Sequence, residues 1–328
     1  MTAVEALVNN IFSVSPDSFQ HLALEIFRYQ YKHNAVYRQW ATMLGRDIET
    51  VNCIADIPFL PVSFFKNNKV ITGKYEPEQI FESSGTTSTE NSRHFVKDIS
   101  LYKTSFTKGF ELFYGNVKDW CIIGLLPSYL ERKGSSLVMM VDELIRLSGH
   151  ENSGFYLYNF DELATILKQL EAAGQKVLLI GVTFALLDFA EQYPLPLQHT
   201  TIMETGGMKG RRKEMIREEV HVYLKQQFGI GKVHSEYGMT ELLSQAYSDG
   251  NGIFTPAPWM KILVRDEDDP LIVKTIGKGL INIIDLANLH SCSFVATDDA
   301  GIIYADGSFE VLGRSDNSDV RGCGLMYG

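Results

Sequence analysis

Apolar residues in the first part of the chain recur every three to four positions, which is the spacing of one face of an α-helix. They begin after Ser15 and Pro16, a pair typical of a helix start, in which the serine caps the first turn and the proline lies within it. The apolar positions on this face include Leu22, Ile26, Tyr29, Val36 and Trp40. The pattern predicts one helix from residue 16 toward Gly45, with its bulky side chains directed into a core.

From about residue 76 the pattern changes to strand-like and helical segments in turn. Strands are expected at 120–126, 176–180 and 200–204, and helices at 135–147, 161–173 and 211–228. Such alternation predicts right-handed βαβ units around a buried sheet. Beyond about residue 256 short strands are expected at 261–264, 271–274, 281–285 and 302–304, which indicates a smaller β-rich lobe.

The predicted fold class is therefore α/β, divided along the chain into four segments. These are an N-terminal helical segment (1–75), an α/β core (76–255), a β-rich lobe (256–313) and a short C-terminal tail (314–328). At 328 residues the chain exceeds the size at which one simple core suffices. No linker rich in proline, glycine or serine splits it, so we expect one large domain with sub-lobes.

Composition narrows the class of protein. A hydrophobic content of 45% and a charged content of 21% are those of an ordinary globular protein. The formal net charge of −10 argues against nucleic acid or an anionic membrane as a partner, because an acidic surface is repelled by both. The longest apolar run, Val177 to Leu187, is too short to span a bilayer, and the N-terminus lacks the basic start of a signal peptide. The four cysteines and eight histidines show no zinc-ligand spacing, so we expect a cytoplasmic protein with free thiols.

Two short polar runs, about 150 positions apart, carry the candidate chemistry. The first is Phe81-Glu82-Ser83-Ser84-Gly85-Thr86-Thr87-Ser88, which begins within the strand-like segment 79–81. A strand that runs into this loop would present N–H and O–H donors around a polyphosphate. The second is Glu236-Tyr237-Gly238-Met239-Thr240-Glu241. It offers an aromatic face for a base, a glycine for close backbone approach, and a hydroxyl and a carboxylate for a divalent cation.

Each run alone has an ordinary structural explanation, since a Ser/Thr/Gly cluster is most often a solvated loop, and Thr240 followed by Glu241 suits a turn that starts a helix. Together, in this order, they resemble the adenylate-forming enzymes, the acyl and aryl acid ligases that couple a carboxylate to ATP. The resemblance implies that residues 83–88 hold the triphosphate, that Tyr237 and Gly238 contact adenine, and that Glu241, beside Thr240, binds Mg²⁺. No Gly-x-x-x-x-Gly-Lys-Ser/Thr loop occurs, which disfavours a P-loop kinase or ATPase.

Three further segments agree with this resemblance. Residues 202–207 resemble a strand that ends in a glycine pair beside the nucleotide, which implies that Gly206 and Gly207 line the site. Residues 297–301 resemble the segment whose aspartate binds the ribose hydroxyls, with Asp298 as the candidate. Residues 313–316 resemble the motif that closes the large N-terminal domain, and this implies a contact from Arg314 to the ribose or a phosphate.

The chain departs from the family pattern in two places. The family's phosphate loop commonly continues through a lysine, whereas residues 88–93 contain none, so Arg93 is the candidate for the positive charge. The chain also stops at Gly328, twelve residues after the hinge-like Asp316. The resemblance then implies that the mobile C-terminal domain, with its late lysine, is absent.

Cys323, in the tail, is the candidate acyl acceptor. Two glycines flank it and Arg321 lies nearby, so the thiol is sterically open and its thiolate is favoured. These features resemble the acyl-protein synthetase component of bacterial luminescence fatty acid reductase systems, a branch that carries its acceptor cysteine near the C-terminus. The resemblance implies activation of a carboxylic acid, expected to be a fatty acid, transfer of the acyl group to Cys323, and delivery to an acyl reductase or carrier.

Two other functions stay open from the sequence. A ligase of related chemistry would pass the adenylate to coenzyme A or a carrier protein, and Cys323 would then be incidental. A non-catalytic nucleotide-binding subunit of an acyl reductase complex would keep the fold without turnover. The missing loop lysine favours this last function.

Overall fold

The computed structural model describes residues 3–83, 91–127, 132–207 and 215–314, which form two compact units. Among the described residues, the first unit comprises 3–83, 91–109, 238–246 and 255–314. The second unit comprises 110–127, 132–207, 215–237 and 247–254. Each unit is thus assembled from segments that are far apart in the sequence. The units group residues by contact, whereas the four segments expected from the sequence divide the chain in order, and that division stays a prediction.

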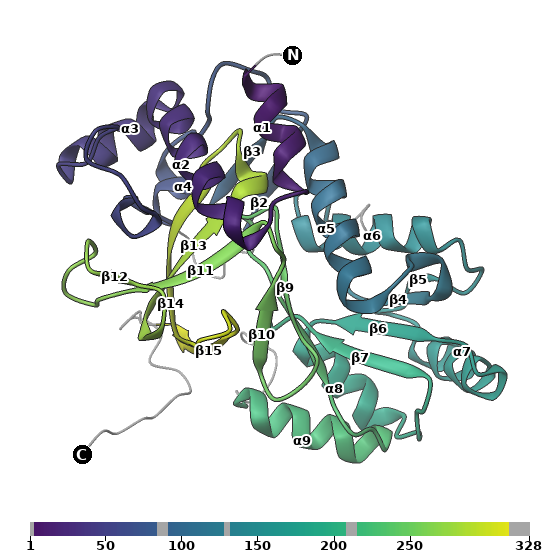
Figure 1. Cartoon of the computed structure of the whole chain (residues 1–328). Helices are drawn as coiled ribbons and strands as arrows, with labels where there is room; N and C mark the ends of the chain where they lie inside the picture. Colours follow the sequence, from purple (N-terminus) through teal and green to yellow (C-terminus); the bar gives the residue numbers. More distant parts are fainter. Residues whose placement is uncertain (1–2, 84–90, 128–131, 208–214, 315–328) are drawn as a thin grey trace, which may run out of the picture. The chain divides into compact units, whose positions relative to one another are not determined.

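The second unit holds a parallel sheet (Figure 1). Its strands are β4 (Cys121–Leu125), β5 (Gly154–Phe155), β6 (Val177–Gly181), β7 (Thr200–Glu204) and β8 (His234–Tyr237), in the order β8-β7-β6-β4-β5. The helices between them are α6 (Ser136–Ser148), α7 (Phe160–Ala173), α8 (Thr183–Gln192) and α9 (Arg217–Phe228). All four neighbouring strand pairs are parallel, so the expected alternation of strand and helix around a buried sheet is confirmed.

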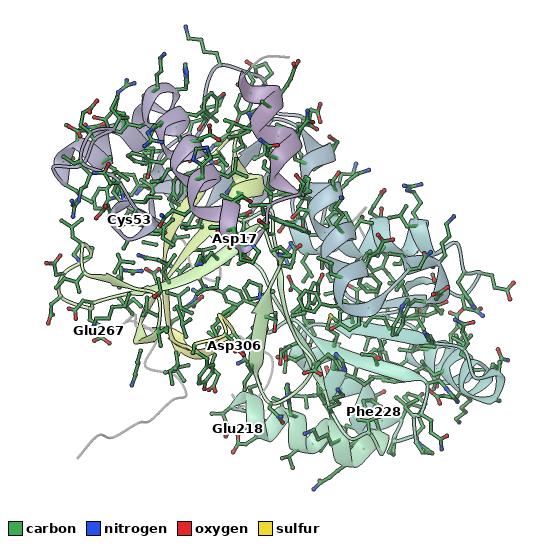
Figure 2. The ribbon with its side chains drawn as sticks, in the orientation of Figure 1. Asp17, Cys53, Glu218, Phe228, Glu267 and Asp306 are labelled. Atoms are coloured by element: carbon green, nitrogen blue, oxygen red, sulfur yellow. The ribbon has the colours of Figure 1, made fainter. Side chains whose placement is uncertain are left out.

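Side chains on the two faces of this sheet explain its layers. Ile123 of β4 lies on the face covered by α7, α8 and α9, in a core that also holds Phe228 at the end of α9 (Figure 2). On the opposite face a Cβ added at Gly124 would lie 2.8 Å from the Phe155 ring and 3.2 Å from Val141 of α6. Strand β6 is buried at every position, which is typical of a parallel strand covered on both faces.

The first unit holds an antiparallel sheet. Strands β11 (Met260–Arg265), β13 (Gly277–Asp285), β14 (Phe294–Ile303) and β15 (Phe309–Arg314) pair in that order, and the short β12 (Val273–Lys274) pairs with the free side of β11. Strand β1 (Leu60–Pro61) pairs with β14 in parallel. A separate hairpin is formed by β2 (Gln79–Glu82) and β3 (Arg93–Val96). The strands expected beyond residue 256 are present, but β13 and β14 are longer than expected.

The helices of the N-terminal region are α1 (Ala3–Ile11), α2 (Pro16–His33), α3 (Ala35–Met43), α4 (Phe64–Asn67) and α5 (Ile99–Tyr114). The predicted cap at Ser15 is confirmed, since its backbone N–H donates to Ser18 Oγ over 2.9 Å and its hydroxyl accepts from the Ser18 N–H. The single helix expected toward Gly45 is wrong, because the chain leaves the helix at Asn34. The Asn34 side chain accepts from the Tyr37 N–H (3.0 Å), and a side chain that caps the next helix competes with continued helical bonding.

The remaining strands, β9 (Ala246–Ser248) and β10 (Ile253–Pro256), lie where the chain passes from one unit into the other and back. Among the residues that the structure describes, no helix is both long and apolar enough to cross a membrane.

Candidate nucleotide-binding site

Two hydrogen bonds close the base of the predicted phosphate loop in the first unit. The Ser83 N–H donates to the Ser92 carbonyl (3.1 Å), and the Ser92 N–H donates to Ser83 Oγ (3.0 Å). Arg93, the first residue of β3, is exposed, and its guanidinium lies 5.7 Å from the centre of the Phe95 ring. The loop residues Ser84, Gly85, Thr86, Thr87 and Ser88 lie outside the described residues. The structure therefore fixes the two ends of this loop.

Glu241 contacts the base of that loop. Its side chain is buried, and the Ser92 hydroxyl lies near enough to its carboxylate to act on the carboxylate's pKa. Burial raises the pKa of Glu241, while the Ser92 hydroxyl and the charges of Arg314 and Lys66 oppose the rise. The helix start considered for Thr240 does not form, because Thr240 and Glu241 lie in a turn between β8 and β9. The structure thus places Ser92, which bonds to the first residue of the first motif, near the last residue of the second motif.

Two buried side chains also hold the backbone of this turn. His94 Nδ1 lies 2.9 Å from the Thr240 carbonyl oxygen, and His94 Nε2 lies 2.9 Å from Asn288 Oδ1. Asn288 Nδ2 donates to the Glu241 carbonyl over 2.7 Å. Sequence reasoning missed both residues because neither belongs to a motif and both are far from the turn along the chain.

Arg314 pairs with Asp299, the neighbour of the predicted Asp298. Asp299 lies opposite Arg314 in the β14–β15 register, and Arg314 Nε lies 3.8 Å from Asp299 Oδ1. Asp298 is exposed, and successive side chains of a strand point to opposite faces. The charge of Asp298 instead acts on Arg265, whose pKa is lowered by burial and raised in part by that carboxylate. Both aspartates are thus candidates for a ribose contact, and only knowledge of the strand faces could have pointed to Asp299.

In the second unit, the predicted glycine pair follows β7 at a sharp turn. Gly206 and Gly207 have φ values of 74° and 91°, which residues with a Cβ atom rarely adopt. Their carbonyls accept hydrogen bonds from the N–H groups of Thr183 (2.9 Å) and Phe184 (3.3 Å), at the start of α8. The Gly206 N–H donates to Glu204 Oε2 over 2.7 Å. The turn is therefore held by backbone and carboxylate contacts together.

Glu204, at the end of β7, is a buried carboxylate that the sequence analysis did not single out. Its Oε1 lies 3.3 Å from Arg217 Nε and 3.7 Å from His221 Nε2. Burial alone would raise the pKa of Glu204. The bond from His221, the charge of Arg217 and the donors of Ser235 and Gly206 outweigh burial and lower this pKa to about 2. Glu204 is consequently ionised at neutral pH and anchors the Gly206 turn.

Tyr237, the predicted adenine-stacking residue, lies at the end of β8. Its ring packs against Phe254 with centroids 5.9 Å apart, and the Arg217 guanidinium lies 5.2 Å from the centre of the Phe254 ring. Beside it, burial and the charge of Glu204 raise the pKa of Glu236 to about 8. The exposed Gly238 follows Tyr237 and is the first residue of the chain's return to the first unit.

Cys323, the predicted acyl acceptor, lies outside the described residues. Three other cysteines are described. Burial raises the pKa of Cys121 to about 11 and that of Cys292 to about 12, so neither forms a thiolate readily. Cys53 is partly buried, and its Sγ lies 3.2 Å from Asp56 Oδ2 (Figure 2 labels Cys53).

Several solved structures share the fold of this chain. One is 2-hydroxyisobutyryl-CoA ligase, with a TM-score of 0.61 and 11% identity over 94% of this chain and 78% of that chain. Another is ATP-bound MatB from Rhodopseudomonas palustris, with a TM-score of 0.53 and 16% identity over 72% of this chain and 47% of that chain. An ATP-bound chimera of RpMatB and BxBclM gives a TM-score of 0.56 at 15% identity, over 74% of this chain and 49% of that chain. The chain thus spans about half the length of the MatB structures.

These likenesses show that the chain shares the fold of these proteins, which agrees with the fold expected from the paired motifs. No curated protein matches the chain by sequence. The sequence profile of one family, "Acyl-protein synthetase, LuxE", matches residues 15–327. The chain belongs to the LuxE acyl-protein synthetase family.

Proposed function

We propose that this chain uses ATP to convert a fatty acid to an acyl-adenylate and then transfers the acyl group to Cys323. The observation that carries the proposal is the contact between Ser92 and Glu241. This contact joins the base of the Ser/Thr loop to a buried carboxylate. The hydroxyl and N–H donors of such a loop suit a polyphosphate, and the carboxylate suits a cation. The ATP-bound state of MatB, which shares the fold, supports ATP as the co-substrate.

In the first half-reaction an oxygen of the substrate carboxylate attacks the α-phosphorus of ATP. The bond from that phosphorus to the bridging oxygen breaks, and pyrophosphate leaves. The donors of residues 83–88, together with Arg93, hold the pyrophosphate, while Tyr237 stacks on adenine and Arg314 contacts the ribose or a phosphate. Their work is to place the reacting atoms in line and to stabilise the charge that develops.

The Glu241 carboxylate and the Ser92 hydroxyl are hard oxygen donors, which are the ligands that Mg²⁺ prefers. The nearby charges of Arg314 and Lys66 oppose the effect of burial on the Glu241 pKa and so favour the ionised carboxylate that a cation needs. These residues therefore fit a magnesium ion. When bound, the ion would neutralise phosphate charge.

In the second half-reaction the Cys323 thiol loses its proton to solvent, and the thiolate attacks the acyl carbonyl carbon. The bond to the adenylate oxygen breaks, AMP leaves, and a thioester remains on the chain for delivery to an acyl reductase or carrier. Membership of an acyl-protein synthetase family supports a protein thiol as the acceptor. The raised pKa values of the buried Cys121 and Cys292 also favour a cysteine elsewhere.

One experiment separates this function from the two alternatives. The protein is incubated with ATP, Mg²⁺ and a radiolabelled fatty acid, with and without coenzyme A, and two quantities are measured. These are acid-dependent exchange of pyrophosphate into ATP, and label that stays with the protein on denaturing gels and is released by hydroxylamine. Exchange with protein label supports the proposal. Exchange with acyl-coenzyme A and no protein label shows a ligase of related chemistry, and ATP binding without exchange shows a non-catalytic subunit.

A further inference from the structure

Two residues that belong to neither motif hold the backbone on both sides of the Glu241 peptide. His94 on β3 and Asn288, the last residue of a short 3₁₀ helix (Leu286–Asn288), are 0% and 1% exposed. Through the distances given above, His94 contacts the carbonyl before Glu241, Asn288 contacts the carbonyl of Glu241 itself, and the two side chains contact each other. The three contacts form one connected set, which we call the His94–Asn288 clamp.

The chemistry of the donors fixes how the clamp is arranged. The Glu241 carbonyl only accepts, so the Asn288 amide must direct Nδ2 toward it, and Oδ1 then faces His94 Nε2. The Thr240 carbonyl also only accepts, so it needs an N–H on His94 Nδ1. Asn288 Oδ1 likewise only accepts. A neutral imidazole has one N–H, so it can donate to only one of these two oxygens, and both contacts are hydrogen bonds only when both ring nitrogens carry a proton.

The residues that contact the backbone of the turn lie close in the chain to a residue near the Glu241 side chain. Ser92, which lies near the Glu241 carboxylate, and His94, which contacts the preceding carbonyl, are two residues apart on the return arm of the phosphate loop. On the other side, Asp285 accepts from the N–H groups of residues 243 and 244 over 2.7 and 3.1 Å, three residues before Asn288 in the chain. Buried side chains thus contact the turn at the carbonyls of residues 240 and 241 and at the N–H groups of residues 243 and 244.

We infer that His94 and Asn288 are positioning residues of the adenylation site, which set the direction of the Glu241 carboxylate by holding the carbonyls of residues 240 and 241. The inference rests on the proposed function. The His94 ring also packs against Phe65, but both of its ring nitrogens face the turn that carries Glu241 or Asn288, which holds that turn. Groups that orient a metal ligand are commonly needed for metal affinity at the level of ten- to a hundredfold.

His290 supplies a matched control. It lies two residues after Asn288, is 8% exposed, and its Nδ1 has no hydrogen-bond partner among the described residues. Burial lowers its pKa to about 4, as it does for His94. The His290 side chain instead contacts the Tyr75 ring and feels the charges of Lys97 and Asp98, which lie outside the turn at 240–241. Substitution there disturbs the same region of the core without touching the clamp.

The test measures two quantities for the parent protein and for His94→Ala, His94→Asn, His94→Gln, Asn288→Ala, the double alanine variant and His290→Gln. The first is the Mg²⁺ concentration that gives half-maximal acid-dependent pyrophosphate exchange, together with the KM for the acid. The second is the dissociation constant of ATP by calorimetry, in Mg²⁺ and in EDTA. Melting temperatures of all variants identify any general loss of packing.

In the alanine variants the half-maximal Mg²⁺ concentration should rise about tenfold or more, while the KM for the acid changes less than about twofold. ATP affinity should fall in Mg²⁺ and stay the same in EDTA. Asparagine and glutamine carry an amide near the place of Nδ1 and Nε2 respectively, so at least one should recover to within about threefold of the parent. The double variant should be no worse than the worse single variant, because the two residues act on one element.

Three results would overturn the inference while leaving the proposed function intact. These are an unchanged Mg²⁺ dependence in the alanine variants, no recovery in either amide variant, and an equal loss in His290→Gln. A parent protein that shows neither exchange nor Mg²⁺-dependent ATP binding would overturn the proposed function and the inference with it.

Discussion

The Ser92 hydroxyl lies near the Glu241 carboxylate and acts to lower its pKa, and the Ser92 backbone bonds to Ser83 at the opposite end of the phosphate loop. One serine therefore couples the loop to a carboxylate about 150 positions away. Because both partners are buried or partly buried, the coupling does not compete strongly with water. Glu241 therefore lies near Ser92, the residue at which the loop leads into strand β3, and so near any phosphate that the loop binds.

Glu241→Gln should lower acid-dependent pyrophosphate exchange by about a hundredfold or more, because the amide keeps the shape but cannot supply a charged oxygen to a cation. The fold should be retained, since the Ser92 hydroxyl can donate to the amide oxygen. Pyrophosphate exchange is measured at a saturating concentration of the carboxylic acid substrate. Glu143→Gln is the control, because Glu143 is also buried but pairs with Arg146 on α6. Exchange within a few fold of the parent would remove Glu241 from the site.

A second prediction separates the two adjacent aspartates of β14. Loss of a charged hydrogen-bond partner of a ligand costs about 1.5–3 kcal/mol, which corresponds to about ten- to a hundredfold in ATP affinity. Asp298→Ala should show this loss in calorimetry if the sequence resemblance aligns the ribose contact correctly. Asp299→Ala and Arg314→Ala should instead show it together if the pair seen in the structure forms the contact. Asp306→Ala, on the exposed turn after β14, is the control. Unchanged affinity in all three variants would exclude this end of β14 from the site.

The order of strands and helices in the second unit could be predicted because each element carries its own signal in the apolar pattern. Asn34 shows where this fails, since its side chain ends one helix and caps the next within an unbroken apolar stripe. The two motifs could be found because their residue types sit side by side in the chain. His94 and Asn288 could not, because their contacts to the turn span 146 and 47 positions and depend on how β3 and the 286–288 helix pack. Likewise, the face of β14 that carries Asp299 is set by its register with β15.

A third prediction concerns Glu236, whose pKa is raised to about 8 by burial and by the charge of Glu204. Between about pH 4.5 and 8 this carboxyl is protonated in the folded protein and ionised in the unfolded chain, so folding takes up a proton. The stability that Glu236 contributes is therefore fully present below about pH 4.5 and is lost as the pH rises toward 8. Each pH unit in this window is worth up to about 1.4 kcal/mol.

Glu236→Gln removes this proton uptake. Between pH 5 and pH 8 the melting temperature of the parent should fall relative to that of Glu236→Gln, and the variant should be the more stable protein near pH 8. The measurement is thermal unfolding across this range at constant ionic strength. Parallel curves for the two proteins would show that Glu236 is ionised in the folded state.

The last prediction separates the two half-reactions through Cys323. Adenylation needs only the nucleotide site, whereas acyl capture needs the thiol, so Cys323→Ser should keep pyrophosphate exchange within about twofold and lose the hydroxylamine-sensitive label. Serine is nearly isosteric, but it forms no oxyanion at neutral pH without a neighbouring base, so the loss should be nearly complete.

Cys53→Ser is the matched control for that variant, because among the three described cysteines Cys53 is the one that is not fully buried. It should keep both the exchange and the label. If Cys323→Ser still forms the labelled thioester and Cys53→Ser does not, then Cys53 is the acceptor, and its contact with Asp56 would have to open before the thiolate could attack. Label retained in both variants would require Cys121 or Cys292 to react in spite of burial, which their raised pKa values oppose.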